Sequence, residues 1–300
     1  MNSKITIEYS TMCFNEQNYL QKINEAKKFL ESEGFDFGIQ IHNSIGAALY
    51  SKLAAIKDDF SFTVHSPVFA DYFFNLAYPD FDALKKQCQN ALKHLIFFNA
   101  DLLFFHGFFM TGKLIPHDMI NYRKTIKSHI PEKYRLNDSF IMNPEYFDSD
   151  EFENYKTIFK KNYAELQKQF PDFKIALEND FVGVGSGLQR PQEILELTDN
   201  LWFDAGHLWC SSLLHNFDFY EASYEIISKK NIVGVHLNHN LMDSSTEKIK
   251  IRDSHTHLYC KNSQNLKPVI KTLLNNGIQR YTLEIEDGDI EDVKILASWL

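Results

Sequence analysis

Short apolar runs alternate with amphipathic segments along the whole chain. Eight of these runs are rich in β-branched and aromatic residues, and polar or turn-forming residues bound them, so they are predicted to be strands. A helical pattern separates most of them, and this alternation is typical of repeated βα units on a parallel sheet. The predicted strands cover residues 5–10, 37–42, 61–65, 101–106, 173–178, 200–204, 232–236 and 280–284.

Capping residues mark the ends of several predicted helices. Asn15 is expected to cap a helix that Gly34 ends, and a helix near Asn262 is expected to end at Gly277. Residues 289–300 complete the last βα unit.

The connection between the fourth and fifth strands, at about 108–171, is longer than one helix needs. A helix is predicted over 148–170, with Asp148 and Glu151 spaced like a capping box. The stretch before it, 111–144, is predicted to be an inserted loop on the rim where the other βα loops lie. Long structured loops on this rim commonly cover an active site.

Eight βα units without a linker or low-complexity stretch predict one domain over residues 1–300. The fold class is therefore α/β, and the predicted architecture is a (β/α)8 TIM barrel. This length is normal for one such barrel, and 26 Phe and 14 Tyr can fill a large core without disulfides.

Composition indicates where the protein is located and which partners it lacks. Cys13, Cys88, Cys210 and Cys260 form no CxxC pair, and the first residues lack the apolar segment of a secretion signal. No apolar run approaches the roughly 20 residues that cross a bilayer. We therefore expect a reduced, cytoplasmic protein with no membrane partner. The net charge of −9 argues against a generally basic surface that coats nucleic acid.

The residues that directly follow the apolar strand cores carry the chemistry. Six strands end in side chains that bind metals, and the carboxyl ends of barrel strands converge on one mouth. The six residues are His65, His106, Glu178, Asp204, His236 and Glu284.

Three further residues extend this set: His207 in the sequence DAGH, and Asp253 and His255 in RDSH. Histidines and carboxylates without thiolates suit zinc, with manganese or iron as alternatives. Nine ligands exceed what one ion of four to six ligands can use, so two or three ions are expected.

These motifs resemble the xylose isomerase-like TIM barrel superfamily, and in particular the metal-site pattern of the endonuclease IV family of abasic-site nucleases. The resemblance covers most of the chain and implies three zinc ions. It implies that His65, His106 and Glu178 hold the first, that Glu178, Asp204, His236 and Glu284 hold the second, and that His207, Asp253 and His255 hold the third. Asn179 and Asn238 also match their family neighbours.

The chain departs from that family at four places. DAGH stands where the family has DTCH, His239 stands where it has Asp, and Tyr259 stands where it has Gly. Val68-Phe69 replaces the Tyr-Leu pair of the loop that penetrates DNA. We therefore expect abasic-site DNA to be cleaved weakly, and a smaller phosphoester or a sugar to be the better substrate.

The other histidines are expected to be ordinary structural residues, and the glycine-rich run 183–187 is expected to be a loop that shapes the pocket. These histidines are His42, His94, His117, His129, His215, His239 and His257.

Three functions follow from the nine-residue set. The first is hydrolysis of a phosphoester by clustered ions, with Glu178 and Glu284 as catalytic residues. The alternative is a sugar isomerase or epimerase that uses Glu178, Asp204, His236 and Glu284 on one ion, with Arg252 or His207 binding substrate oxygens. The third is a metal-stabilised binding protein without activity. The sequence leaves the oligomeric state open.

Overall fold

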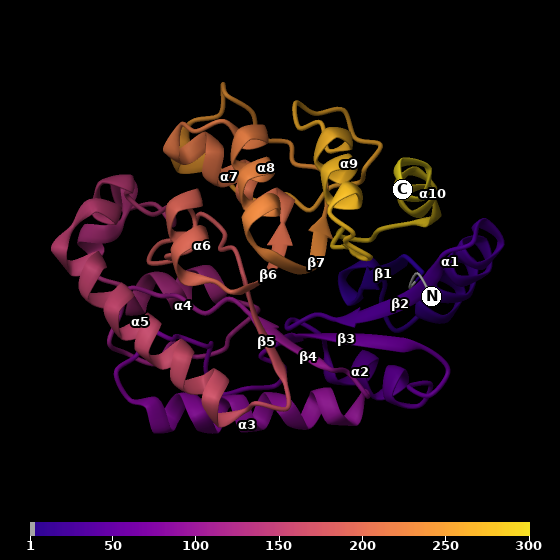
Figure 1. Ribbon diagram of the computed structural model, residues 1–300, viewed down its shortest axis with the longest axis horizontal. Coiled ribbons are helices and arrows are strands. Elements are labelled where there is room, and N and C mark those ends of the chain that lie inside the picture. The colour runs from indigo at the N-terminus through magenta and orange to yellow at the C-terminus, as the bar shows by residue number, and fades with distance from the viewer. Residues whose placement is uncertain (1–3) are drawn as a thin grey trace.

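The computed structural model describes residues 4–300 and contains a closed barrel of eight parallel strands, each paired with its neighbours in chain order (Figure 1). β1 also pairs with β8, which closes the barrel. The strands are β1 (Thr6–Ser10), β2 (Asp36–Ile41), β3 (Ser61–Ser66), β4 (Leu102–Phe105), β5 (Lys174–Glu178), β6 (Asn200–Asp204), β7 (Asn231–Leu237) and β8 (Arg280–Leu283).

All eight strands lie within one residue, at each end, of the ranges predicted from the sequence. The predicted α/β barrel is confirmed. Most strands begin with an exposed or half-buried residue and become fully buried toward their carboxyl ends, as in β5. A side chain at a carboxyl end is therefore removed from water, although it lies near the mouth of the barrel.

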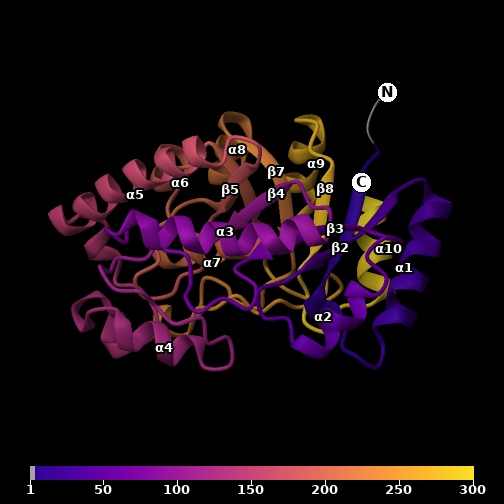
Figure 2. The same ribbon diagram turned by 90° about the horizontal axis from the view of Figure 1, so that it is seen from below.

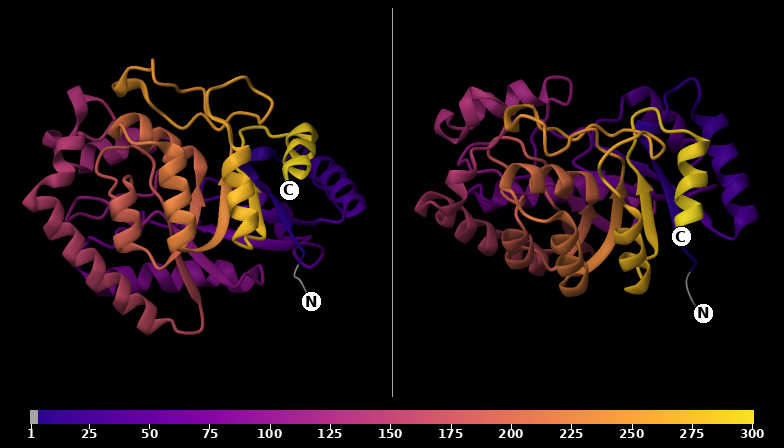
Figure 3. Two further views of the ribbon diagram at one scale, coloured as in Figure 1. Left: turned by 45° about the horizontal axis from the view of Figure 1, so that its top comes forward. Right: turned by 90° about the horizontal axis from the view of Figure 1, so that it is seen from above.

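Helices surround the barrel (Figures 1 and 3). Their bounds are α1 (Tyr19–Glu33), α2 (Ala47–Ala54), α3 (Phe81–Phe97), α4 (Tyr122–His129), α5 (Asp150–Gln169), α6 (Pro191–Leu197), α7 (Ala205–His215), α8 (Phe219–Lys229), α9 (Lys267–Asn275) and α10 (Ile290–Trp299). Short 3-10 turns are η1 (Thr11–Cys13), η2 (Glu132–Tyr134), η3 (Leu136–Asp138), η4 (Pro144–Asp148) and η5 (Lys248–Lys250). No helix among the described residues is both long and apolar enough to span a membrane.

The predicted ends of two helices at glycine residues are confirmed, but the predicted cap at an asparagine is wrong. Gly34 and Gly277 have φ angles of 90° and 76° and follow α1 and α9, because glycine adopts this left-handed conformation without strain. Asn15, in contrast, does not cap α1. Its Oδ1 accepts hydrogen bonds from the backbone N–H groups of Gln17 and Asn18, so it forms a turn before the helix begins at Tyr19.

The capping box predicted for α5 is wrong. Ser149 is the cap, because its Oγ accepts a hydrogen bond from the Phe152 N–H at 3.2 Å. Asp148 instead pairs with Arg190 at 2.8 Å, and Glu151 pairs with a lysine of the preceding connection. Both side chains that the spacing predicts to cap the helix form ion pairs with residues outside the helix instead.

The connection between β4 and β5 holds α4, the turns η2 to η4, and α5. Its first part, predicted as a loop over 111–144, contains helical turns and is fastened to the loop that follows β5. Met142 N–H donates to the Val182 carbonyl at 3.2 Å, and Val184 N–H donates to the Phe140 carbonyl at 2.6 Å. Figure 2 shows α4 set apart from α3 and α5, on the same lower side as α2. This connection is therefore a fixed part of the barrel mouth.

Candidate metal centre

The six strand-end residues meet at the carboxyl mouth of the barrel. His65, Glu178, Asp204 and His236 lie within the last residues of β3, β5, β6 and β7, and His106 and Glu284 directly follow β4 and β8. Glu178, Asp204 and His236 are 0% exposed, and Glu284 is 2% exposed. Their donor atoms, with those of the three further residues, fall into three groups in which all atoms lie within 4.8 Å of one another.

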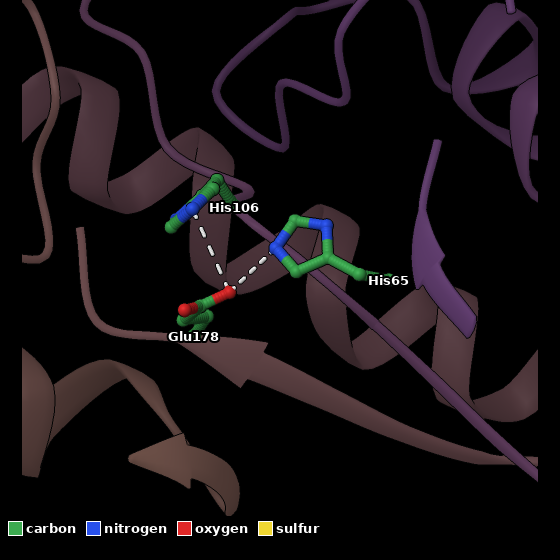
Figure 4. A group of neighbouring side chains, drawn as sticks. All are labelled: His65, His106 and Glu178. Atoms are coloured by element: carbon green, nitrogen blue, oxygen red, sulfur yellow. Dashed lines mark hydrogen bonds and ion pairs between the residues drawn. The ribbon is translucent and has the colours of Figure 1, made fainter. Parts of the chain in front are cut away.

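The first group consists of His65, His106 and Glu178 (Figure 4). Both imidazoles point to one carboxylate oxygen: His65 Nε2 lies 2.7 Å and His106 Nε2 lies 3.5 Å from Glu178 Oε2. The two rings come from neighbouring strands and lie on the same side of the carboxylate. The arrangement leaves three donor atoms that a single small cation can contact.

The second group shares Glu178 with the first and adds Asp204, His236 and Glu284. His236 Nδ1 lies 2.6 Å from Glu178 Oε1, 3.4 Å from Asp204 Oδ2 and 3.4 Å from Glu284 Oε2. Glu178 thus turns one oxygen to each group. A carboxylate in this position can bridge two cations.

The third group consists of His207, Asp253 and His255. Asp204 brings His207 to the mouth, because its Oδ1 caps α7 by accepting the His207 N–H at 2.6 Å. Gly206 gives Asp253 room, since a Cβ atom on Gly206 would lie 2.3 Å from Asp253 Oδ2. The glycine of DAGH, a departure from the family motif, therefore permits the close approach of Asp253.

Hydrogen bonds fix the orientation of three histidine rings. His207 Nδ1 and His255 Nδ1 each lie 3.0 Å from a backbone carbonyl, of Asn179 and of Glu284 respectively. A carbonyl only accepts, so Nδ1 is the donor and Nε2 is the nitrogen turned toward the other side chains of the centre. In His236 both nitrogens face acceptors, because Nε2 donates to Gln40 Oε1 at 2.8 Å and Nδ1 lies 2.6 Å from Glu178 Oε1. Such outer partners commonly orient histidines that bind metals.

The carboxylates of the centre lack a permanent cationic partner. Within residues 4–300, the ion pairs of Glu178, Asp204, Asp253 and Glu284 are all with histidines, and none is with lysine or arginine. Asp204 Oδ2 is buried and accepts no hydrogen bond. Burying several carboxylates without compensating charge is costly. The donor set therefore fits bound divalent cations.

The pKa values of two histidines and of Glu178 are shifted by the charged groups gathered in this site. Burial alone would lower the pKa of His236, but Glu284 and Glu178 outweigh it and raise that pKa well above its usual value. Burial also opposes the shift of His207, whose pKa the carboxylates Asp204 and Asp253 raise to about 9. Although burial favours the neutral acid, the surrounding histidines hold the pKa of Glu178 well below its usual value. The site attracts positive charge.

A cavity of about 930 Å³ opens above this centre. His106, His207, Asp253, His255 and Glu284 line it, whereas Glu178, Asp204 and His236 lie beneath. Most of the remaining wall comes from the loops after β2, β5 and β7 and from the β4–β5 connection. A substrate in the cavity would reach the third group and Glu284 first.

One residue of the site was missed in the sequence. His42, expected to be structural, lines the cavity, and its Nε2 lies 3.3 Å from Glu284 Oε1. Burial lowers its pKa well below the usual value, so His42 is held neutral. The available signal was its position, since it follows the apolar core of β2 as the ligand candidates follow theirs.

A fourth group, His257 with Asp289 and Asp292, has internal partners instead. His257 Nδ1 donates to Asp292 Oδ2 at 2.7 Å, and Asp289 and Asp292 form the capping box of α10. Its polar atoms stabilise a helix end, in line with the structural role expected for His257.

Comparison with known proteins places the fold. Neither protein-family models nor curated proteins match the chain. Among solved structures, a D-tagatose 3-epimerase-like protein matches at 18% identity and a TM-score of 0.61, covering 99% of this chain and 97% of that one. The fold is a xylose isomerase-like TIM barrel. An L-ribulose 3-epimerase matches at 13% identity and a TM-score of 0.53, covering 98% of this chain and 85% of that one.

An endonuclease IV from Thermus thermophilus also matches this barrel, at 12% identity and a TM-score of 0.49. It covers 99% of this chain and 98% of that one. At such identities the likeness establishes the fold, and the activity has to be inferred from the site.

Proposed function

We propose that this barrel is a metal-dependent hydrolase of phosphoesters with a multinuclear centre. The observation that carries the proposal is the third group, His207, Asp253 and His255, beside two groups that already share Glu178. A one-ion enzyme has no evident use for this third set of donors. Three adjacent donor sets instead fit chemistry in which several ions act on one phosphate.

Each of the three groups would hold one ion, and Glu178 belongs to both the first group and the second. Histidine and carboxylate donors favour zinc, and manganese or iron also suit them. Divalent ions held there would supply a water nucleophile at neutral pH and offset the charge of the attacked phosphate.

The protein's own groups have separate tasks in this reaction. The water oxygen forms a bond to phosphorus, the bond from phosphorus to the leaving oxygen breaks, and that oxygen takes up a proton. Glu178 is buried below the cavity, so its task is to hold the centre together. Glu284 lines the cavity and turns Oε1 to His42, so this carboxylate can accept the proton of the water.

A sugar isomerase or epimerase is the second candidate, and the fold likeness to two sugar epimerases favours it. It would use one ion on Glu178, Asp204, His236 and Glu284, with the two glutamates moving protons beside the substrate carbonyl. His207 and Arg252 both line the cavity and would bind substrate hydroxyl groups.

Metal counting together with three substrates separates these functions. Protein purified without added ions is analysed for bound metal, then assayed with bis(4-nitrophenyl) phosphate, with an abasic-site duplex at low and moderate salt, and with ketohexoses in deuterated water. The hydrolase predicts two or three ions per chain, turnover of the small diester and weak nicking of the duplex. One ion with deuterium exchange into the sugar would establish the epimerase instead, and a metal-stabilised scaffold would show no turnover. Efficient nicking at both salt concentrations would make DNA the substrate.

A further inference from the structure

We infer that the substrate is a small phosphoester carrying a planar ring, which lies on an aromatic wall of the cavity while Arg252 contacts its phosphate. This inference rests on the proposed hydrolase function and adds the substrate class. It depends on three features outside the metal centre: the roof of the cavity, the aromatic wall, and two arginines without acidic partners.

The roof limits the size of the substrate. Residues of the β4–β5 connection, among them Met119, Tyr122, Ile126 and Phe140, line the cavity across from the loop after β7. Backbone hydrogen bonds hold this connection to residues 182–184, as described above. A cavity of about 930 Å³ bounded in this way is within the usual range for sites of small molecules.

Four aromatic contacts form a wall from this roof down to the centre. Tyr122 packs edge-on against Phe140 with ring centroids 5.9 Å apart, and Phe140 stacks with Phe181 at 6.1 Å and an interplanar angle of 9°. Phe181 in turn contacts His106 at 5.5 Å and His207 at 6.1 Å. A planar ring on this wall gains stacking contacts, and its phosphate can reach the first and third groups.

Gly183 is required for the packing of the wall. A Cβ atom at this position would lie 2.2 Å from Phe181 Cε2 and 2.8 Å from Phe140 Cε1. Any side chain there would push the two rings from their present positions. The aromatic wall is therefore fixed by the backbone of the loop after β5, and it can be disturbed without removing either ring.

Two guanidinium groups line the cavity without an acidic partner within residues 4–300. Arg252 is exposed, its side chain makes no hydrogen bond or ion pair with the described residues, and it directly precedes Asp253 of the third group. Arg123 lies over the rings of Tyr122 and Phe140, at 5.6 Å and 5.7 Å from their centroids. Arginine binds phosphate oxygens strongly and also stacks on aromatic rings. Arg252 thus adjoins a donor of the third group in the chain, whereas Arg123 lies on the rings of the roof.

Two phosphonates that cannot be hydrolysed test this inference by calorimetry on the metal-loaded protein. Phenylphosphonate carries a planar ring, and propylphosphonate carries a flexible chain with the same charged group. We expect phenylphosphonate to bind about tenfold more tightly, because stacking on aromatic side chains contributes a gain of this order. Arg252→Gln should weaken both ligands about fivefold or more, since it removes a contact to their common phosphonate group.

Variants of the wall test the role of the rings. Phe140→Leu keeps apolar volume without a planar ring, and Gly183→Ala displaces the rings without removing them. Both should reduce the preference for phenylphosphonate to less than about threefold, with little change for propylphosphonate. Phe97→Ala, at an exposed position of α3, and Lys168→Gln, at an exposed position of α5, serve as controls and should change neither affinity.

Equal affinities of the wild-type protein for the two phosphonates would overturn the inference, and so would an unchanged preference in both wall variants. Turnover of bis(4-nitrophenyl) phosphate is recorded on the same samples. If that diester is hydrolysed while the phosphonates bind equally, the hydrolase stands and the substrate class is wrong. If no phosphoester is hydrolysed, the proposed function itself fails.

Discussion

Buried carboxylates in two regions of the barrel are stabilised in different ways. Deeper in the interior, Glu8 of β1 is 1% exposed. It accepts hydrogen bonds from Thr63 Oγ1 at 3.0 Å and Thr282 Oγ1 at 2.6 Å, and it forms an ion pair with Arg280 Nε at 3.7 Å. At the mouth, Glu178 is equally buried, but within residues 4–300 its ion pairs are with histidines alone.

The difference shows what each region is built for. A buried charge is tolerated when it is paired and hydrogen-bonded, and Glu8 meets this condition within the protein. The carboxylates of the mouth pair, among the described residues, with histidines, which carry a charge only when protonated, so this region suits a bound cation. We therefore expect Glu8 to contribute to stability and Glu178 to function, and variants of the two residues can test this difference.

The largest effect is expected from Glu178→Gln compared with Glu8→Gln. Glu178→Gln removes the shared carboxylate at nearly constant volume, so hydrolysis should fall by about a thousandfold or more while the barrel stays folded. Glu8→Gln should keep its bound ions and its turnover per folded molecule, but lose about 1–3 kcal/mol of unfolding free energy. Metal analysis, kinetics and chemical unfolding of both variants check the pair. Near-normal turnover of Glu178→Gln would contradict the role given to that residue.

His255→Ala should have the next largest effect. It removes one donor of the third group, so we expect the loss of one bound ion and a decrease of about a hundredfold in phosphoester hydrolysis. His257→Ala is the matched control, because that histidine belongs to the group stabilised by the capping box of α10 and should leave the metal count unchanged. An epimerase would lose little activity in either variant, so the two together separate the candidate functions.

Gln40→Leu should produce a smaller loss. Gln40 Oε1 accepts the proton of His236 Nε2, and Gln40 Nε2 donates to Thr282 Oγ1 at 3.3 Å, which fixes the orientation of the amide. Without this acceptor the orientation of the His236 ring is no longer fixed, so metal affinity should fall about tenfold to a hundredfold. Gln40→Glu keeps an acceptor and should restore most of the affinity. Unchanged affinity in Gln40→Leu, measured by competition with a chelator, would show that Gln40 does not position His236.

The smallest effect concerns a partly buried histidine outside the metal centre. Burial, with smaller contributions from Arg190 and Lys248, lowers the pKa of His215 from 6.5 to about 3. The native state holds His215 neutral, so its stability contribution is complete above pH 6.5 and is lost as the pH falls toward 3. The loss is at most about 1.4 kcal/mol per pH unit. His215→Gln cannot be protonated and should show a flatter decrease in unfolding free energy between about pH 7 and pH 4. Equal slopes for both proteins would refute this assignment.

The strands and the nine candidate ligands could be located from sequence because both depend on short-range pattern. A buried strand of a parallel barrel is an uninterrupted apolar run, and the next polar residue marks its carboxyl end, as Glu178 does in β5. Barrel topology then brings such ends together. The metal-binding role of these residues and the single-domain organisation remain predictions, and so does the cytoplasmic location.

The predictions for the α5 cap and for His42 were wrong for one physical reason. These side chains interact with residues far away in the chain rather than with their sequence neighbours. Asp148 and Glu151 have the spacing of a capping box. Asp148 pairs with Arg190 instead, and Glu151 pairs with Lys133. His42 was expected to be a structural residue. Its place beside the centre is shown by its contact with Glu284, which lies 242 residues away in the chain.

The sequence by itself determined the alternation of strands and helices, the order of the strands and the residue type at each strand end, because each follows from local periodicity. Only the tertiary structure decided that Glu178 shares one oxygen with each of two donor groups, and that Gly206 lets Asp253 approach the start of α7. It also decided that the β4–β5 connection covers the mouth with Tyr122 and Phe140. These features depend on distances between segments far apart in the chain, which the packing of the whole barrel sets and no local pattern encodes.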